Sequence, residues 1–276
     1  MTTVIKIGGS ILEPEPAPAC APALARWAGA GPLAIVHGGG KTLSALLEKL
    51  HVASQFHNGL RVTDPATLEA ALLALAGGVN KKLVAALNRA WRAAGLRARA
   101  VGLTGLDGDC LFARPLDPAL GLVGEPVEGS PALLRGLLDQ GRVPVLASLA
   151  AVAADSPVTA PALNVNADSF AAAIALQLKA ARLLLVTDVA GVLDAQGQLI
   201  PQIRLDELES LLAGGVIRGG MLPKLDACRQ ALAGGVMEVQ ILGAAALAAD
   251  LPAGRYPHTR ILPALSSAAP VMEAAL

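Results

Sequence analysis

The sequence of 276 residues has little of what most often reveals a protein's function. It holds three Phe, two Trp and one Tyr, which are too few rings for base stacking on nucleic acid to be its main task. Acidic and basic residues balance, so no net field favours nucleic acid or a membrane surface. Apolar runs fall short of the roughly 20 residues that a membrane span needs. We therefore expect neither a nucleic-acid nor a membrane partner.

Cysteine is also scarce. Cys20, Cys110 and Cys228 are odd in number and far apart, which fits neither a disulfide framework nor a zinc site. The first residues lead straight into an apolar strand, without the basic segment and cleavage site of a signal peptide. Buried thiols in a cytoplasmic protein are therefore expected. A P-loop is excluded, because the chain has no Gly-x-x-x-x-Gly-Lys-Ser/Thr motif.

The opening segment carries the first positive signal. Residues 4–7 are an apolar run interrupted only by Lys6 and ended by Gly8 and Gly9. This pattern is typical of a buried strand that brings a cation to the carboxyl edge of an α/β sheet, where ligands bind. A lysine beside exposed backbone N–H groups suits a phosphate. The alternative is that Lys6 only snorkels to solvent and the glycines only make a turn.

The same pattern recurs at residues 33–50. The apolar run 33–36 indicates a strand covered on both faces, and it leads through His37 into Gly38, Gly39 and Gly40. A helix with leucines at helical spacing follows. Three consecutive glycines leave N–H groups exposed and favour an anion site over a generic turn. His37 is expected to be a packing or hydrogen-bonding residue.

Elsewhere the apolar periodicity predicts an alternation of strands and helices, and hence an α/β fold. Segments 110–113 and 122–127 predict a hairpin that breaks this alternation and forms a lid or rim over a ligand. Pro144 indicates a strand start or a sheet edge, and residues 259–262 a short edge strand. The other predicted strands span 98–103, 143–147, 183–186 and 236–242. The predicted helices span 21–28, 64–78, 80–95, 131–141, 169–180, 203–214 and 222–233.

Two polar groups in the first two-thirds of the chain are candidates for binding. Arg61 lies in a polar loop and suits a carboxylate, or it is a solvated surface residue. Asn164, Asn166 and Asp168 alternate with apolar residues before a helix, so on an extended segment they share one face. Helix capping would explain Asp168 but not the two asparagines.

Two more candidates follow. Thr187 and Asp188 follow strand 183–186, and Asp188 either holds a nucleotide hydroxyl or turns the chain. Lys224 lies near a helix N-terminus, where the helix dipole disfavours a cation. Either an anion close to Lys224 offsets this unfavourable interaction, or the side chain points to solvent, where the interaction is weak.

Six segments in this order resemble the amino-acid kinase family, and within it the N-acetylglutamate kinases. The resemblance runs from Lys6 to Leu262, and although each segment alone is weak, all six together are specific. They are KIGG at 6–9, HGGG at 37–40, NGLRVT at 58–63, NVNAD at 164–168, TDVAGV at 187–192 and GMLPK at 220–224.

This resemblance implies a three-layer αβα sandwich around an open, mainly parallel sheet. Residues 1–263 would form a single domain and 264–276 a loose tail. An N-terminal lobe of about 1–168 would bind the acyl amino acid and dimerise, and a C-terminal lobe of about 169–263 would bind ATP. The implied reaction is ATP-dependent phosphorylation of the γ-carboxylate of N-acetyl-L-glutamate, the second step of arginine biosynthesis. Mg²⁺ would be held by the ATP phosphates rather than by the protein.

The resemblance also implies roles for single residues. The lysines would neutralise the transferring phosphoryl group, Asp168 would hold them, and glycine N–H groups would donate to it. The implied catalytic residues are Lys6, Lys224, Asp168, Gly9 and Gly39. The implied substrate-binding residues are Gly39, Gly40, Arg61 and Asn164. The implied ATP-binding residues are Lys6, Gly8, Asp188, Val189, Ala190, Gly191, Val192, Leu193, Val216, Ile217, Arg218 and Lys224.

The chain departs from the family pattern in two places. His258 stands where the family usually has glycine, and we give it no catalytic role. Arginine-inhibited hexameric relatives carry an extra helix before the first strand, but Lys6 comes too early in this sequence to leave room for it. We therefore predict a homodimer without arginine feedback.

Other functions remain open. One is a related kinase for an aminoadipate derivative on a carrier protein, which would want a basic groove. Aspartate kinase and uridylate kinase fit less well, because no regulatory domain follows and the loop at 58–63 is of the acetylglutamate type. A non-enzymatic sensor of this fold would be expected to lose Lys6, Asp168 or Lys224.

Overall fold

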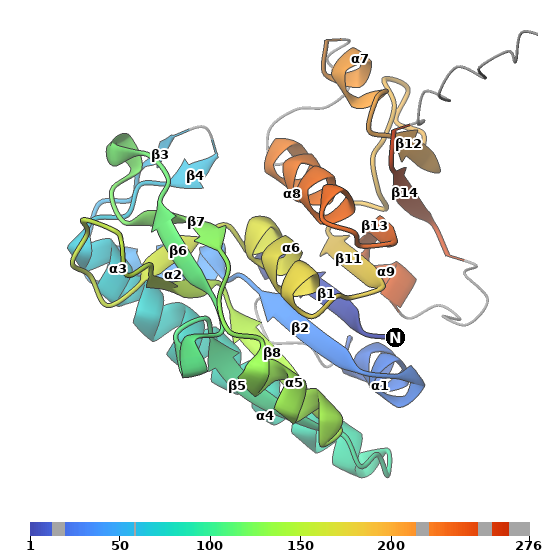
Figure 1. Ribbon diagram of the computed structural model, residues 1–276, viewed down its shortest axis with the longest axis horizontal. Helices are drawn as coiled ribbons and strands as arrows, with labels where there is room; N and C mark the ends of the chain where they lie inside the picture. The colour runs from blue at the N-terminus through green and yellow to red at the C-terminus, as the bar shows by residue number, and fades with distance from the viewer. Residues whose placement is uncertain (13–19, 58, 214–220, 248–255, 265–276) are drawn as a thin grey trace, which may run out of the picture.

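An eight-stranded sheet forms the centre of the protein in a computed structural model, which describes all residues except 13–19, 58, 214–220, 248–255 and 265–276 (Figure 1). Its strands are β1 (Thr3–Ile7), β2 (Leu33–His37), β5 (Arg99–Thr104), β8 (Arg142–Ala147), β11 (Arg182–Thr187), β12 (Gln202–Arg204), β13 (Glu238–Gly243) and β14 (His258–Leu262). Their order is β12-β14-β13-β11-β1-β2-β8-β5, and only β13 and β14 pair antiparallel. The predicted α/β class with a mainly parallel sheet is confirmed.

Helices cover both faces of this sheet, so the molecule has three layers. The helices are α1 (Ala21–Ala30), α2 (Gly40–Lys49), α3 (Pro65–Ala71), α4 (Asn80–Ala93), α5 (Ala132–Asp139), α6 (Ala167–Gln177), α7 (Leu208–Ala213), α8 (Met221–Ala233) and α9 (Ala244–Leu247). One apolar cluster joins α5, α6 and α8 to one face, and another joins α1, α4 and α9 to the other. All three cysteines are unpaired and buried within these clusters, as expected.

The alternation of side chains along β1 determines the face of the sheet on which Lys6 lies. Successive residues of a strand point to opposite faces, so Val4 and Lys6 share one face and Ile5 and Ile7 the other. Val4 belongs to the cluster under α6 and α8, whereas Ile5 and Ile7 belong to the cluster under α1 and α4. Lys6 therefore lies under α6 and α8. β1 is also the point from which the strand order proceeds in two directions, because β2 pairs with it on one side and β11 on the other. All three strands are parallel, so their carboxyl ends lie at one edge of the sheet. Ligands bind at such a switch point.

A second, four-stranded β unit stands beside the main sheet. It comprises β6 (Phe112–Pro115), β7 (Val123–Val127), β9 (Leu149–Val152) and β10 (Leu163–Val165), closed in the order β10-β7-β6-β9. The predicted hairpin is confirmed as the antiparallel pair of β6 and β7. It is bonded through β7 to β10 and through β6 to β9, so it forms part of the wall of this β unit rather than a free-standing flap.

One continuous helical stretch of 29 residues, Pro65–Ala93, is long and apolar enough by composition alone to cross a membrane. Part of it packs in the core, where Leu83, Leu87 and Trp91 are fully buried between α1 and the sheet. A helix of this length and composition also occurs in the core of soluble proteins, so it is weak evidence for a membrane span. The sequence leaves open whether Asn80 opens a new helix or continues one, and here it continues one, because a π-helical segment, Leu72–Val79, joins α3 to α4.

Three predictions about the sheet need correction. Residues 203–214 do not form one helix, because Gln202–Arg204 is a strand paired with β14, and α7 begins only at Leu208. Consequently β14 is not the edge, since β12 lies outside it. Pro144 lies in an internal strand between β2 and β5; the pairing with β2 begins one residue later, at Val145, so the missing N–H is tolerated.

Candidate active site

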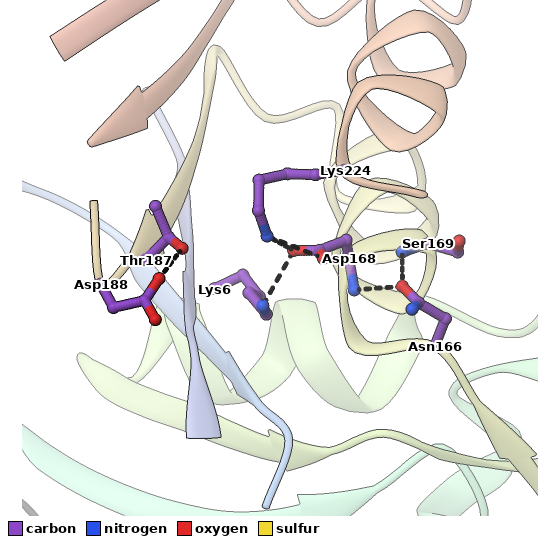
Figure 2. A network of polar contacts seen from close by, with 7 residues as sticks. All are labelled: Lys6, Asn166, Asp168, Ser169, Thr187, Asp188 and Lys224. Atoms are coloured by element: carbon purple, nitrogen blue, oxygen red, sulfur yellow. Dashed lines mark hydrogen bonds and ion pairs between the residues drawn. The ribbon is translucent and has the colours of Figure 1, made fainter. Parts of the chain in front are cut away.

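Two lysines and one aspartate form a buried ion triad at the carboxyl edge of the sheet. Lys6 Nζ lies 2.9 Å from Oδ1 of Asp168, and Lys224 Nζ lies 2.9 Å from Oδ2 (Figure 2). Each residue is at most 7% exposed. The alternatives in which Lys6 snorkels and Lys224 points to solvent are therefore wrong.

The triad draws on three distant parts of the chain, β1, α6 and α8. α6 and α8 pack side by side on the sheet face that carries Lys6, α6 over β1 and α8 over β13 (Figure 1). The aspartate lies in the first turn of α6, where the helix dipole favours an anion. The lysine of α8 stands near that helix's beginning, and Asp168 is the anion that offsets its unfavourable position.

Burial and mutual charge shift the ionisation of the triad. Burial lowers the pKa of Lys6, and repulsion from Lys224 lowers it further, against the attraction of Asp168. Burial works to raise the pKa of Asp168, but the two lysines hold it below its ordinary range. With two ammonium groups for one carboxylate, the triad has a surplus positive charge that an incoming anion would balance.

The cap of α6 is Asn166, not Asp168. The side-chain oxygen of Asn166 accepts hydrogen bonds from the backbone N–H groups of Asp168, at 2.9 Å, and Ser169, at 3.2 Å (Figure 2). This cap frees the carboxylate of Asp168 for the lysines. The expectation that Asn164, Asn166 and Asp168 share a strand face is wrong, because β10 ends at Val165 and Asp168 is already helical.

The two glycine turns lie against each other beside the triad. A Cβ atom added at Gly9 would lie 3.2 to 3.3 Å from the backbone of Gly39 and Gly40. One added at Gly39 would lie 2.8 Å from Leu75 and 2.9 Å from Val79, both in the π-helical segment. Side chains are therefore excluded where the turns after β1 and β2 approach each other, and only backbone is presented there.

A cavity of about 200 Å³ opens beside these turns, between α2 and the small β unit. All four predicted substrate-binding residues line it: Gly39, Gly40, Arg61 and Asn164. Asn166 and Ser148 line it too. The sequence singled out Asn166 without giving it a site role, and no signal marked Ser148, which reaches the cavity only because β8 and β9 meet there.

Arg61 is fixed at the wall of this cavity. Its guanidinium donates to Ser44 Oγ at 2.7 Å, to Gly40 O at 3.2 Å and to Ser54 Oγ, and it lies 4.6 Å above the Phe56 ring. It is only 8% exposed, so the surface interpretation is wrong. Asn164 Nδ2 donates to Thr63 Oγ1 at 3.1 Å, which orients the amide at the cavity.

A second cavity of about 350 Å³ lies next to the first and extends from the hairpin to α8. Its described lining is largely apolar, and its charged members are Glu125 and Asp226. It thus connects the neighbourhood of Lys224 to the outer rim of the small β unit.

The predicted nucleotide loop after β11 divides into two parts. Asp188, Val189, Ala190 and Leu193 are exposed, with Asp188 accepting a hydrogen bond from Thr187. Gly191 and Val192 are interior: Val192 N donates to Thr259 Oγ1, and a Cβ at Gly191 would lie 2.5 Å from that atom. These two residues tie the loop to β14 rather than face a ligand.

Gly8 is buried at the end of β1, where its N–H donates to Val186 O at 3.0 Å. Val216, Ile217 and Arg218 lie outside the described residues, as does most of the predicted tail. His258 begins β14, and its ring contacts Tyr256 and the Tyr256 carbonyl, in keeping with a structural role. Within the described ranges, no group of three or more His, Cys, Asp or Glu side chains is placed to hold a metal ion.

Comparisons with known proteins agree on one family. Acetylglutamate kinase from Dinoroseobacter shibae is 43% identical over 242 residues, covering 87% of this chain and 80% of that protein. Acetylglutamate kinase from Azorhizobium caulinodans is 41% identical, covering 84% and 74%. The crystal structure of smu.665 from Streptococcus mutans UA159 superposes with a TM-score of 0.77 at 29% identity, covering 95% and 98%. A profile described as "Amino acid kinase family" matches residues 1–243, and the chain belongs to that family.

Proposed function

We propose that this protein phosphorylates the γ-carboxylate of N-acetyl-L-glutamate with ATP, giving N-acetylglutamyl 5-phosphate for arginine biosynthesis. The observation that carries the proposal is the buried triad with surplus positive charge, next to a small cavity that holds one arginine. The relatives named acetylglutamate kinase, at 40–43% identity over most of the chain, support this substrate.

The chemistry needs little beyond charge and position. A carboxylate is ionised at neutral pH, so the attacking oxygen needs no general base. That oxygen forms a bond to the γ-phosphorus while the bond to the bridging oxygen breaks, and ADP leaves with the electron pair. Phosphoryl transfer is catalysed mainly by alignment and by stabilising charge on the equatorial oxygens. Lys6 and Lys224 would supply that charge from two sides.

Backbone N–H groups would complete the cradle. Those of Gly9 and Gly39 lie where the two turns meet and would donate to the same phosphoryl oxygens. Asp168 would keep both ammonium groups in place without touching substrate. It is fully engaged by the lysines, so it is a poor candidate for a metal ligand.

The acyl amino acid would occupy the cavity of about 200 Å³. Arg61 would bind its α-carboxylate, since a guanidinium can pair with both oxygens, and Asn164 would help to orient the substrate. Gly39 and Gly40 would contact it through the backbone. The existing bonds of Arg61 to Ser44 and Gly40 hold the guanidinium ready, which reduces the ordering cost of binding.

ATP would lie over the C-terminal half, with Lys6, Gly8 and Lys224 at its phosphates. Asp188, Val189, Ala190 and Leu193 would border the nucleoside, and their exposure beyond the end of β11 supports this role. Gly191 and Val192 would act only by shaping that loop, and residues 216–218 keep their role as a prediction. Mg²⁺ would come with ATP, held by the phosphates.

The alternative substrate, a carboxylate carried by a small protein, is less well supported. A docking groove for such a carrier would want lysines and arginines, but the cavity that leads to the outer rim is lined by Glu125 and Asp226. Two lobes divided near residue 168, a homodimer without arginine feedback and a cytoplasmic location also stay predictions. Mass measurement by light scattering, with and without arginine, addresses the assembly.

A hydroxylamine-trapping assay tests the function directly. The enzyme, ATP and Mg²⁺ are incubated with N-acetylglutamate, glutamate, aspartate or aminoadipate, and the hydroxamate is measured. N-acetylglutamate should give the highest kcat/KM by a wide margin. Hydroxamate from free glutamate or aminoadipate at an equal rate would contradict the proposed substrate, and none from any of the four would contradict the proposed reaction.

A further inference from the structure

Two fully buried polar side chains lie behind the glycine turn, on the face of the sheet away from the triad. His37 is the last residue of β2, and Asn80 is the first of α4; both are 0% exposed. His37 Nδ1 lies 2.8 Å from Gly38 O, and His37 Nε2 lies 3.0 Å from Asn80 Nδ2. Asn80 Nδ2 also lies 2.8 Å from Val145 O in β8. A chain of hydrogen bonds thus runs from the middle of the sheet to the turn.

Its donors and acceptors have one consistent assignment. Gly38 O and Val145 O can only accept. Asn80 therefore donates from Nδ2 to its two nearer acceptors, Val145 O and His37 Nε2, with Leu103 O a longer contact at 3.4 Å. His37 carries its proton on Nδ1 and donates to Gly38 O. The ring must be neutral for Nε2 to accept. Burial, with a smaller contribution from the charge of Lys81, lowers the pKa of His37 to about 4, which agrees with a neutral ring.

The bond to Gly38 O fixes the next N–H in the chain. In a trans peptide the C=O of one residue and the N–H of the next point in opposite directions. With Gly38 O held by His37, the N–H of Gly39 points away from His37. The nitrogen of Gly39 is also among the atoms nearest Gly9, where the two turns meet. The hydrogen bond therefore sets the direction of a donor at the proposed phosphoryl site.

Three glycines in a row need such a restraint. Glycine has the widest choice of backbone conformations, so an unrestrained turn would sample several orientations of this peptide group. A donor contributes most to catalysis when it is already aligned before the charge develops. Leu75 and Val79 of the π-helical segment leave no room for a side chain at Gly39. The hydrogen bond from His37 to Gly38 O then fixes the orientation of the peptide group.

The buried amide of Asn80 lowers the stability of the fold, which indicates a role other than stabilisation. Its Oδ1 is buried and finds no hydrogen-bond partner among the described residues. It also requires glycine at the neighbouring position 102, because a Cβ there would lie 2.1 Å from Oδ1. An unsatisfied buried polar atom is destabilising, and an apolar side chain would avoid that cost. Besides its bonds to the backbone oxygens of Val145 and Leu103, what the amide provides is a donor to His37.

We propose that His37 and Asn80 are positioning residues that aim the Gly39 N–H at the transferring phosphoryl group. Neither touches substrate; both act through the Gly38–Gly39 peptide. The proposal rests on the proposed phosphoryl transfer, in which Gly39 N–H is a donor, but the hydrogen-bond chain itself can be tested without activity.

The kinetic test replaces His37 by leucine, which fills space but cannot donate. We expect His37→Leu to lower kcat by about ten- to a hundredfold with both KM values within about twofold, since the aligned donor acts in the transition state. Inhibition by ADP with aluminium fluoride, a mimic of the transferring group, should weaken by a similar factor while ADP alone binds as before. An unchanged kcat, or a loss confined to KM, would overturn the proposal.

Two further variants keep the test decisive if His37→Leu does not fold. His37→Asn retains an amide near the Nδ1 position that can donate to Gly38 O, so its kcat should exceed that of His37→Leu or, if the latter is unfolded, lie within tenfold of wild type. Asn80→Ser removes the donor to His37 and should lower kcat. The matched control is Asn88→Ser on the same helix, which loses bonds to Ala100 but does not reach the turn. If Asn88→Ser lowers kcat as much as Asn80→Ser, the effect is general destabilisation and the proposal fails.

NMR of the ¹⁵N-labelled imidazole separates this proposal from the assigned reaction. The His37 ring should show the neutral Nδ1–H form from pH 7 down to about pH 5, and Asn80→Ser should shift its Nε2 resonance. A ring protonated on Nε2 would overturn the proposal whatever the enzyme catalyses. The expected spectrum together with no hydroxamate from the wild-type enzyme would instead reject the function and remove the catalytic part of this inference with it.

Discussion

Removal of the single negative charge of the triad is the perturbation with the largest expected effect. Asp168→Asn keeps the shape of the side chain and one oxygen acceptor, but it leaves two buried ammonium groups facing a neutral amide. Because both lysines are at most 7% exposed, water cannot replace the lost charge without opening the site. The variant should therefore be less stable as well as less active.

The structure bounds the size of this effect. At 2.9 Å and an effective dielectric constant of about 20, each lysine gains about 6 kcal/mol of attraction from the carboxylate before desolvation is counted. Breaking a buried pair by removing one partner costs about 3–5 kcal/mol net. The amide oxygen retains part of one contact, so we expect the free energy of unfolding to fall by about 3 kcal/mol.

Urea unfolding with and without Mg²⁺–ADP measures the free energy of unfolding of Asp168→Asn and of the wild type. Nucleotide phosphates would bring negative charge back to the lysines, so ADP should raise the midpoint of the variant more than that of the wild type. Asp155→Asn is the control, because Asp155 pairs with Arg114 at the exposed surface and its loss should leave the midpoint unchanged. If the free energy of unfolding falls no more for Asp168→Asn than for Asp155→Asn, the reasoning is refuted.

Three more predictions concern the rest of the site. Lys6→Ala and Lys224→Ala should each lower kcat far more than the affinity for ATP, measured by steady-state kinetics and calorimetry; equal losses would assign the lysines to ground-state binding only. Arg61→Ala should mainly raise the KM for the acyl amino acid, by about ten- to a hundredfold for a lost charged contact, and an unchanged KM would remove it from the site. His37 should make stability fall with acidity: its pKa is lowered from 6.5 to about 4 in the fold, so below pH 6.5 the unfolded chain binds the extra proton. Its contribution is complete above pH 6.5 and falls by about 3 kcal/mol on the way to pH 4, and an identical pH dependence for His37→Asn in urea unfolding would contradict it.

Much of the site could be predicted because its determinants are local. The alternation within β1 places Lys6 on one face, and the glycine runs mark turns that must be bare. Both follow from a few adjacent residues and need no knowledge of the partners. The position of Lys224 against the helix dipole even indicated an anion close by, and Asp168 is that anion.

What could not be predicted depends on contacts between distant segments. Asn166 rather than Asp168 caps α6 because the lysines, far away in sequence, claim the carboxylate. The strand at 202–204 has only three residues, too few for a periodic pattern, and it exists because Ile203 pairs with Ile261. The link from His37 to Asn80 joins two elements 43 residues apart.

The central place of β1 has a consequence for synthesis on the ribosome. This strand is made early, yet the partner on one of its sides, β11, begins only at Arg182. At about 5–20 residues per second, roughly 10–35 s pass between the two strands. For that time one side of β1 presents unpaired N–H and C=O groups beside apolar side chains, a template for pairing with other chains. Until β11 arrives, that side of β1 can be shielded only by other parts of the nascent chain or by a chaperone.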